Sequence, residues 1–235
     1  MKNQAHFRKI PPDDGFAAVV FDFDGTLAEL HLDFSAMRSA ICSLLDRYGL
    51  NPQDYAHLYI LEMIEAAASG LDAKDGLGKH FFLEAMEKLA AMETEAAVET
   101  ALFDGVRDLL GDLSLAGITT GIITRNCRAA VATVFPDYGD YIAALITREM
   151  TRYVKPDPRH LWEMLSCLDA SPARSLMVGD HPIDIRVGRD VGTFTAAVTT
   201  GTGEMENLRL AGPDFLLSRV TEIRDIAIGA RRKPL

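Results

Sequence analysis

The chain has 235 residues, of which 48% are hydrophobic and 25% are charged, and its formal net charge is -10 at pH 7. This composition is typical of a globular protein with a substantial core, and it argues against disordered, collagen-like and disulfide-dense classes. The negative charge repels polyanions at long range, so neither nucleic acid nor an anionic membrane is expected as the main partner.

The length predicts one core domain with a sizeable insert. Residues 1–15 are expected to form an N-terminal tail: they lack the apolar run of a signal peptide, and no stretch of the sequence is apolar for long enough to span a bilayer. The widely spaced Cys42, Cys127 and Cys167 form no CxxC pair and are expected to be reduced thiols. We therefore expect a cytoplasmic protein. The basic run Arg231–Lys233 is expected to be a solvated end without a role.

Short, nearly continuous apolar runs predict strands that are buried on both faces of a parallel sheet. The first run is Phe16–Phe23, and Gly-Thr follows soon after it. The others lie at 118–124, 141–147, 175–179, 193–199 and, more weakly, 214–217. Segments of helical character separate the later runs. The alternation predicts an α/β fold, a Rossmann-like, doubly wound parallel sheet with helices on both faces.

Residues 31–103 interrupt this alternation and carry almost no strand signal. Their apolar residues recur at helical spacing, at Met37, Ile41, Leu44 and Leu45, then Leu58, Leu61, Met63 and Ile64, then Phe82, Met86 and Leu89. About three or four helices inserted after the first strand are therefore expected. The predicted organisation is an α/β core of residues 16–30 and 104–235, with an all-helical cap domain of residues 31–103 joined to it by hinges.

Polar residues gather where the predicted strands end, and in open α/β sheets ligands bind at these ends. They are Asp22, Asp24, Gly25 and Thr26 after the first strand, Thr124, Arg125 and Asn126 after the second, Lys155 and Pro156 after the third, and Asp180 and Asp184 after the fourth. Carboxylates at a buried strand need a compensating charge. Since Mg²⁺ prefers carboxylate oxygens and leaves positions open for water and phosphate, Asp22 and Asp180 are candidate ligands of this ion.

Four segments in this order resemble the four motifs of the haloacid dehalogenase superfamily: DFDGT, the Thr that ends IIT, the Lys of VKPDP and the acidic VGDHPIDI. A DxD pair alone is weak evidence, whereas four ordered motifs across nearly the whole chain are specific. The helical insert between the first two motifs resembles the first cap class of this superfamily. Phosphoglycolate phosphatases, β-phosphoglucomutases and pyrophosphatases share that class, and residues 195–223 resemble the same region of phosphoglycolate phosphatase-like members.

The resemblance implies a Mg²⁺-dependent phosphohydrolase. Asp22 is implied to be the nucleophile that forms an aspartyl phosphate, and Asp24 the group that protonates the leaving alkoxide and then deprotonates the attacking water. The second Asp of DFD indicates an oxygen leaving group. The implied metal ligands are Asp22, the main-chain carbonyl of Asp24, and Asp180. Asp184 is expected to reach the ion through water rather than directly.

The phosphate group is implied to contact Asp22, Thr124, Arg125, Asn126 and Lys155. Thr124 and the N–H groups after it are expected to bind the equatorial phosphoryl oxygens, and Lys155 to add positive charge where negative charge concentrates in the transition state. Thr124 and Lys155 thereby join Asp22 and Asp24 as the implied catalytic residues. Arg125 is also a candidate partner for a substrate carboxylate.

The expected partner is a small phosphorylated metabolite, phosphoglycolate-like or a sugar phosphate, and the chain is expected to be a monomer or a homodimer. Many related phosphatases continue DGTL with Val-Asp-Ser, whereas this chain reads DGTLAELHLDF, which leaves the substrate open. Candidate cap contacts are His31, Arg38, Lys79 and His80, and each also fits a solvated helix face.

Two alternatives to a phosphatase stay open. A phosphosugar mutase of the β-phosphoglucomutase type uses the same two aspartates, but it returns the phosphoryl group to a sugar instead of to water. An inactive binding protein on the same scaffold is the other alternative, and it is disfavoured because every catalytic position is filled.

Overall fold

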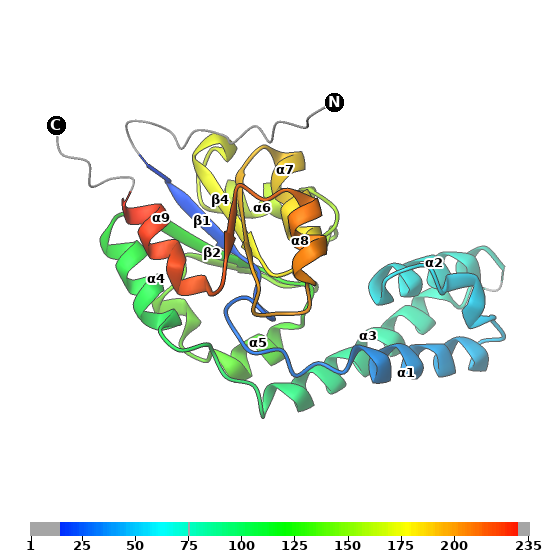
Figure 1. The fold of residues 1–235 in the computed structure, drawn as a ribbon. Coiled ribbons are helices and arrows are strands. Elements are labelled where there is room, and N and C mark those ends of the chain that lie inside the picture. The colour runs from blue at the N-terminus through cyan, green and yellow to red at the C-terminus, as the bar shows by residue number, and fades with distance from the viewer. Residues whose placement is uncertain (1–14, 75, 230–235) are drawn as a thin grey trace. The chain divides into compact units, whose positions relative to one another are not determined.

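The structure is a computed structural model of the chain, and it describes residues 15–74 and 76–229. The described residues form two compact units. One unit contains the chain up to Leu30 and again from Thr100, and the other is His31–Glu99 (Figure 1). The second boundary thus lies at Glu99–Thr100, whereas the sequence predicted it between residues 103 and 104.

Two of the predicted segments fall largely outside this description. Of the predicted N-terminal tail only Gly15 is described, and the basic run Arg231–Lys233 lies outside the described residues. None of the helices in the described part of the chain combines the length and the apolar character that crossing a membrane requires. The cytoplasmic location stays a prediction.

Within the described residues, six parallel strands form one sheet in the order β3-β2-β1-β4-β5-β6. They are β1 (Ala18–Phe21), β2 (Thr119–Ile123), β3 (Ala144–Ile146), β4 (Ser175–Gly179), β5 (Phe194–Val198) and β6 (Phe215–Leu217). Each strand lies inside one of the runs predicted from sequence. The predicted Rossmann-like α/β fold is confirmed.

Helices cover both faces of this sheet. They are α4 (Val106–Leu115), α5 (Arg128–Val134), α6 (Arg159–Cys167), α7 (Pro182–Val191), α8 (Met205–Ala211) and α9 (Ile223–Gly229), with 3-10 turns η2 (Tyr138–Asp140), η3 (Pro172–Arg174) and η4 (Val220–Glu222). On β1, Val19 and Phe21 pack into a cluster with α4 and α9, whereas Ala18 and Val20 pack into a cluster with α6 and α7. Because both faces are covered, the strands read as continuous apolar runs.

The strand order places a ligand-binding edge between β1 and β4. From β1 the chain adds β2 and β3 on one side of the sheet, and then β4, β5 and β6 on the other. Phe21 of β1 pairs in register with Val178 of β4. The residues that follow these two strands therefore emerge at the same edge. Open α/β sheets bind ligands at the carboxyl ends of strands where the order reverses in this way.

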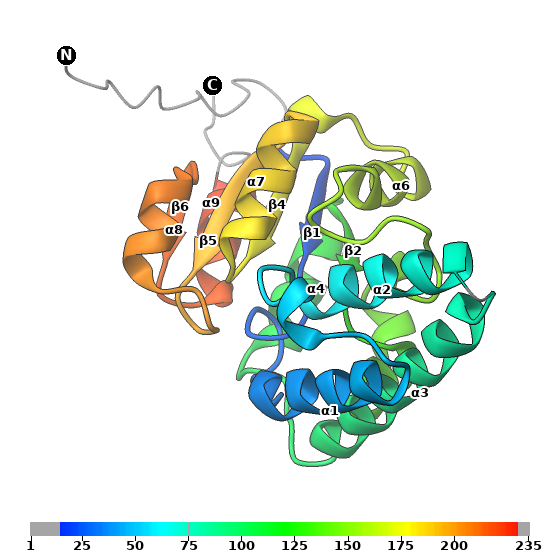
Figure 2. The ribbon, with the colours of Figure 1, turned by 90° about the vertical axis from the view of Figure 1, so that its right-hand side faces the viewer.

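The regular secondary structure in the described residues of the second unit is all helical. It contains α1 (Phe34–Arg47), the 3-10 turn η1 (Pro52–Tyr55), α2 (Ile60–Lys74) and α3 (Gly78–Ala97), and the three α-helices pack against one another (Figure 2). Asp33 caps α1, because its Oδ1 accepts a hydrogen bond of 2.8 Å from the N–H of Ala36. Helix α1 buries the predicted residues Met37, Ile41, Leu44 and Leu45.

The buried face of α3 differs from the predicted one. The structure buries Phe81, Ala85 and Leu89, whereas the predicted Phe82 and Met86 are only half-buried. The physical reason is the close approach of α2 at Gly78, where an added Cβ would lie 2.0 Å from the carbonyl oxygen of Ala68. Gly78 begins the i, i+3, i+7, i+11 stripe that contains the three buried residues, so this contact turns that stripe inward.

Candidate active site

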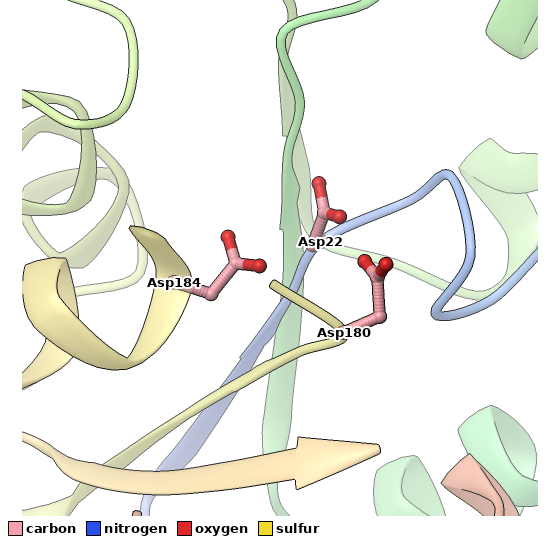
Figure 3. A group of neighbouring side chains, drawn as sticks. All are labelled: Asp22, Asp180 and Asp184. Carbon is pink, nitrogen blue, oxygen red and sulfur yellow. The ribbon is translucent and has the colours of Figure 1, made fainter. Parts of the chain in front are cut away.

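Three buried carboxylates, Asp22, Asp180 and Asp184, meet at the edge between β1 and β4 and form the metal-type acidic group found among the described residues. Figure 3 shows them approaching one another from the end of β1, the end of β4 and the first turn of α7. One carboxylate oxygen from each lies within 4.8 Å of the other two. Three carboxylates this close and this buried require positive charge nearby.

Lys155 supplies one such charge. Its Nζ donates hydrogen bonds of 2.6 Å to Oδ1 of Asp22 and 2.7 Å to Oδ1 of Asp184. Burial alone lowers the pKa of Lys155, but the charges of Asp184 and Asp22 outweigh it and raise that pKa above its ordinary value. Lys155 therefore stays protonated, as its predicted role requires.

Negative charge remains in excess even with Lys155 in place. Burial raises the pKa of Asp22 to about 6, although the charge of Lys155 opposes the rise, and the nearby Asp180 adds to it. Burial also raises the pKa values of Asp180 and Asp184. One ammonium cannot balance three carboxylates. The donor set is hard oxygen, buried and under-neutralised, and it therefore fits Mg²⁺.

The carboxylate of Asp180 is held by two threonines. Thr26 donates from its hydroxyl to Oδ1 at 3.3 Å, and the N–H of Thr202 donates to Oδ2 at 2.9 Å. An added Cβ on Gly201 would lie 1.9 Å from Oδ2 of Asp180, so only glycine fits there. Neither Thr26 nor Thr202 was predicted from sequence to hold Asp180, although the glycines after the fifth predicted strand were a signal for such a close approach.

Both oxygens of Asp184 are engaged by the protein. Oδ1 accepts from Lys155, and Oδ2 accepts a hydrogen bond of 3.1 Å from the N–H of His181 at the start of α7. His181 completes a capping box, because its Nδ1 accepts from the N–H of Ile183 at 3.2 Å. That Asp184 reaches the ion through water stays a prediction, and its carboxylate belongs to the same acidic group as those of Asp22 and Asp180.

Asp24 joins the end of β1 to the end of β2. Thr124 donates from its hydroxyl to Oδ2 of Asp24 at 3.2 Å, and Asn126 donates from its side-chain amide to Oδ1 at 2.9 Å. The N–H of Asn126 in turn donates to the hydroxyl of Thr124 at 2.9 Å. Two residues expected to bind phosphate thus also hold the expected acid and base, a relationship that sequence spacing does not reveal.

Arg125 lies beside Lys155, whereas the four candidate cap contacts lie in the helical unit. Nη1 of Arg125 donates to the main-chain carbonyl of Lys155, so its guanidinium lies beside the loop that carries the lysine. His31, Lys79 and His80 are exposed residues of the helical unit, and Arg38 donates from Nη2 to the carbonyl of Leu58 within that unit. Their contact with substrate stays a prediction, as do the phosphate-binding roles in the core.

Comparison with known proteins gives concordant results. The sequence model of the family described as haloacid dehalogenase-like hydrolase matches residues 19–198. The chain is 32% identical over 216 residues to an N-acetylmuramic acid 6-phosphate phosphatase of Pseudomonas putida, covering 89% of this chain and 95% of that protein. It is 26% identical over 220 residues to the pyrophosphatase PpaX of Bacillus velezensis, covering 91% of this chain and 97% of that protein.

Solved structures share the fold. A hydrolase from Pseudomonas syringae superposes with a TM-score of 0.67 at 18% identity, covering 88% of this chain and 95% of that one. The family match extends from β1 to the end of β5 and contains all four motif segments, which confirms the resemblance. The name of the Pseudomonas putida relative, a phosphatase of a sugar phosphate, agrees with the expected hydrolysis of a phosphoric monoester. The chain belongs to the haloacid dehalogenase-like hydrolase family.

Proposed function

We propose that this chain is a Mg²⁺-dependent phosphatase that hydrolyses a small phosphomonoester through a phosphorylated Asp22. The observation that carries the proposal is the buried contact of 2.6 Å between Lys155 and Asp22 beside two further carboxylates. A carboxylate fixed against a cation at a metal-type cluster is arranged as a nucleophile for a phosphoryl group.

Asp22, Asp180 and the main-chain carbonyl of Asp24 would hold the Mg²⁺, with Asp184 reaching it through water. When bound, the ion offsets the charge of the carboxylates and of the phosphate oxygens, so that an anionic ester can approach an anionic nucleophile.

Asp22 and Asp24 carry out the two chemical steps of the reaction. Asp22 forms a bond from its carboxylate oxygen to phosphorus as the bond to the ester oxygen breaks, and Asp24 gives its proton to that leaving oxygen. Water then forms a bond to phosphorus as the bond to Asp22 breaks, and Asp24 takes a proton from the water. Free phosphate leaves and Asp22 is restored.

Thr124 and Lys155 serve the transferring group in both steps. The hydroxyl of Thr124 and the N–H groups after it bind the equatorial phosphoryl oxygens, together with Asn126 and Arg125, and the ammonium of Lys155 supplies charge where negative charge concentrates. Lys155 needs no rearrangement to act, because its contacts to Asp22 and Asp184 already exist. Such preorganised charge is effective in a buried site.

A sugar phosphate with a carboxyl group is the first substrate class to test. Two relatives, at 32% and 30% identity, are named N-acetylmuramic acid 6-phosphate phosphatases. Phosphoglycolate shares both the carboxyl and the phosphate group. These two phosphatases and the pyrophosphatase PpaX are hydrolases by name, so a phosphosugar mutase is not favoured. A cytoplasmic location and a monomer or homodimer are part of the proposal.

The test measures phosphate release from a panel with Mg²⁺ and with chelator. The panel contains N-acetylmuramic acid 6-phosphate, phosphoglycolate, glucose 6-phosphate, β-glucose 1-phosphate and pyrophosphate. Mg²⁺-dependent release from an ester without a bisphosphate activator, with a phosphoryl group trapped on Asp22, supports the proposal. Conversion that requires a bisphosphate indicates the mutase, and no release from any compound indicates the inactive scaffold.

A further inference from the structure

His160 is a fully buried histidine that lies outside the four motif segments. It lies in the first turn of α6, five residues after Lys155. Its Nδ1 accepts a hydrogen bond of 3.2 Å from the N–H of Lys155, and its Nε2 lies 3.2 Å from the carbonyl oxygen of Ile146, the last residue of β3. The ring therefore bridges the loop that carries Lys155 and a strand of the central sheet.

The two contacts determine the protonation of the ring. A main-chain N–H can only donate, so Nδ1 must be the unprotonated nitrogen, and a neutral imidazole then has its proton on Nε2, where it donates to Ile146. Burial lowers the pKa of His160 to about 3, and the charge of Lys155 contributes to the shift. The ring is neutral over the ordinary pH range and can make both bonds at once.

The main chain of Lys155 is held on its other side as well. Its carbonyl accepts from Nη1 of Arg125, and the carbonyl of Arg125 accepts from Nη1 of Arg148 at 3.2 Å. A lysine side chain is long and flexible, so the place of its ammonium depends on how firmly its own backbone is fixed. Side chains therefore bind both the N–H and the carbonyl of Lys155, although this residue lies in a loop.

We propose that His160 is a positioning residue that, by accepting from the N–H of Lys155, keeps the ammonium in contact with Asp22 and Asp184. The inference rests on the proposed function for its effect on turnover, but not for its geometry. The alternative is that His160 only joins α6 to β3 and fills space in the core. The two roles use different ring nitrogens, so they can be separated.

Two isosteric substitutions each keep the hydrogen-bonding group of one ring nitrogen of His160 and remove that of the other. His160→Asn places an amide oxygen at the position of Nδ1, so it keeps the acceptor for Lys155 and loses the bond to Ile146. His160→Gln places an amide nitrogen at the position of Nε2, so it keeps the donor to Ile146 and leaves the N–H of Lys155 unpaired. Leu165→Ala, which opens a cavity at another buried residue of α6, is the control for lost packing.

The kinetic expectation is asymmetric. His160→Gln should slow formation of the aspartyl phosphate in a single turnover by about 10- to 100-fold, the usual cost of removing a group that orients a site residue, with a smaller change in KM. His160→Asn should keep most of the wild-type rate. Amide hydrogen exchange at Lys155 should accelerate in the Gln variant and stay slow in the Asn variant. Equal losses in both variants, or a loss in Leu165→Ala that matches the Gln variant, would overturn the positioning role.

A measurement on the unmodified protein needs neither substrate nor a folded variant. A long-range proton–nitrogen spectrum of imidazole should show His160 neutral with its proton on Nε2, and a through-bond coupling should link its Nδ1 to the amide of Lys155. A proton on Nδ1 at neutral pH would overturn the inference even if the enzyme were active. Conversely, a chain that releases no phosphate from any ester overturns the proposed function, while this spectrum and the amide exchange still decide the inference.

Discussion

The side-chain amide of Asn126 donates a hydrogen bond of 2.9 Å to Oδ1 of Asp24, a residue 102 positions away in the sequence. This contact and the hydroxyl of Thr124 hold both carboxylate oxygens of Asp24 at the end of β2. A general acid and base must be held within reach of the leaving oxygen and later of water. The chemistry assigned to the first motif therefore depends on residues of the second.

Asp24→Asn tests the acid and base role. The variant loses a transferable proton, but the main-chain carbonyl that would ligate Mg²⁺ remains, so metal affinity should change little. Turnover should fall most for alkyl esters and least for an aryl phosphate, whose leaving oxygen scarcely needs a proton. The measurement is kcat/KM for both ester types, with Mg²⁺ affinity by calorimetry. Equal losses on the two esters would contradict the role.

Asn126→Ala should reproduce that pattern in weaker form. Asp24 would keep the bond from Thr124 and lose the 2.9 Å bond from Asn126. A hydrogen bond to a charged group contributes roughly 1.5–3 kcal/mol, so a loss of roughly 10- to 150-fold in kcat is expected for alkyl esters. If Asn126 serves only to bind phosphate, aryl and alkyl esters should lose activity to the same extent, which steady-state kinetics on both esters would reveal.

Asp22→Asn should remove turnover while the protein stays folded. The amide cannot attack phosphorus, so the loss should exceed about a thousandfold, the scale observed when one member of a catalytic unit is removed. Circular dichroism verifies the fold of the variant. A folded variant that retains a tenth of the wild-type rate would show that another group is the nucleophile.

The same substitution should stabilise the metal-free protein at neutral pH. The pKa of Asp22 is raised from 3.8 to about 6, so its contribution to stability is fully present below 3.8 and is lost as the pH rises through about 6. A shift of this size corresponds to roughly 3 kcal/mol. In chelator, the unfolding temperature of Asp22→Asn should therefore exceed that of wild type by more at pH 8 than at pH 5.

Asp137 provides a control, because its pKa is shifted in the opposite direction from that of Asp22. Asp137 is paired with Arg107 at 2.7 Å, and its hydrogen bond with Arg107 lowers the pKa of Asp137. Asp137→Asn should give no stabilisation at pH 8. Added Mg²⁺ should raise the unfolding temperature of wild type more than that of Asp22→Asn, because the variant has lost a ligand. A wild type that is as stable as Asp22→Asn in chelator at pH 8 would contradict the buried-charge argument.

His160 should make stability depend on pH in the opposite direction. Its pKa is lowered from 6.5 to about 3, so its contribution to stability is fully present above 6.5 and is lost as the pH falls toward 3. The free energy of unfolding of wild type minus that of His160→Asn should therefore fall by about 1.4 kcal/mol per pH unit below pH 6. Urea unfolding from pH 4.5 to 8 measures the difference, and parallel curves for the two proteins would contradict it.

The fold and the core motifs were predictable from sequence because their signals are local. A strand buried on both faces is continuously apolar, and Asp22, Thr124 and Asp180 follow such strands directly. Parallel strands bring their carboxyl ends to one edge of the sheet whatever their order. The meeting of these residues could therefore be inferred without knowledge of the strand order.

The rest depends on packing that no local pattern encodes. The inward face of α3 follows from the approach of α2 at Gly78, and an apolar residue on either adjacent stripe gives the same periodicity. His160 appears in the sequence as a lone histidine in a helix, and only the fold brings its Nδ1 to Lys155. Asn126 was assigned to phosphate by analogy, and its bond to Asp24 required the structure.

The last prediction separates two residues of the helical unit that the sequence presented as equal candidates for substrate contact. Arg38 of α1 donates from Nη2 to the carbonyl of Leu58, and its Nη1 lies 3.9 Å from Sδ of Met63, so it ties α1 to α2 and the segment before it. Lys79 is exposed in the first turn of α3. Arg38→Ala should thus lower the free energy of unfolding by about 1–3 kcal/mol through the lost bond, whereas Lys79→Ala should change it by less than about 0.5 kcal/mol.

Their effects on catalysis should divide in the same way. If the helical unit selects the substrate, Lys79→Ala should alter kcat/KM among natural esters and leave a small aryl phosphate nearly unchanged, because specificity is a difference between substrates in transition-state binding. Arg38→Ala should lower kcat/KM for all esters by the same factor, as a consequence of its lower stability. Denaturant unfolding together with kinetics on three esters measures both quantities. A change of selectivity in Arg38→Ala at unchanged stability would show that its bond to Leu58 is not what fixes its role.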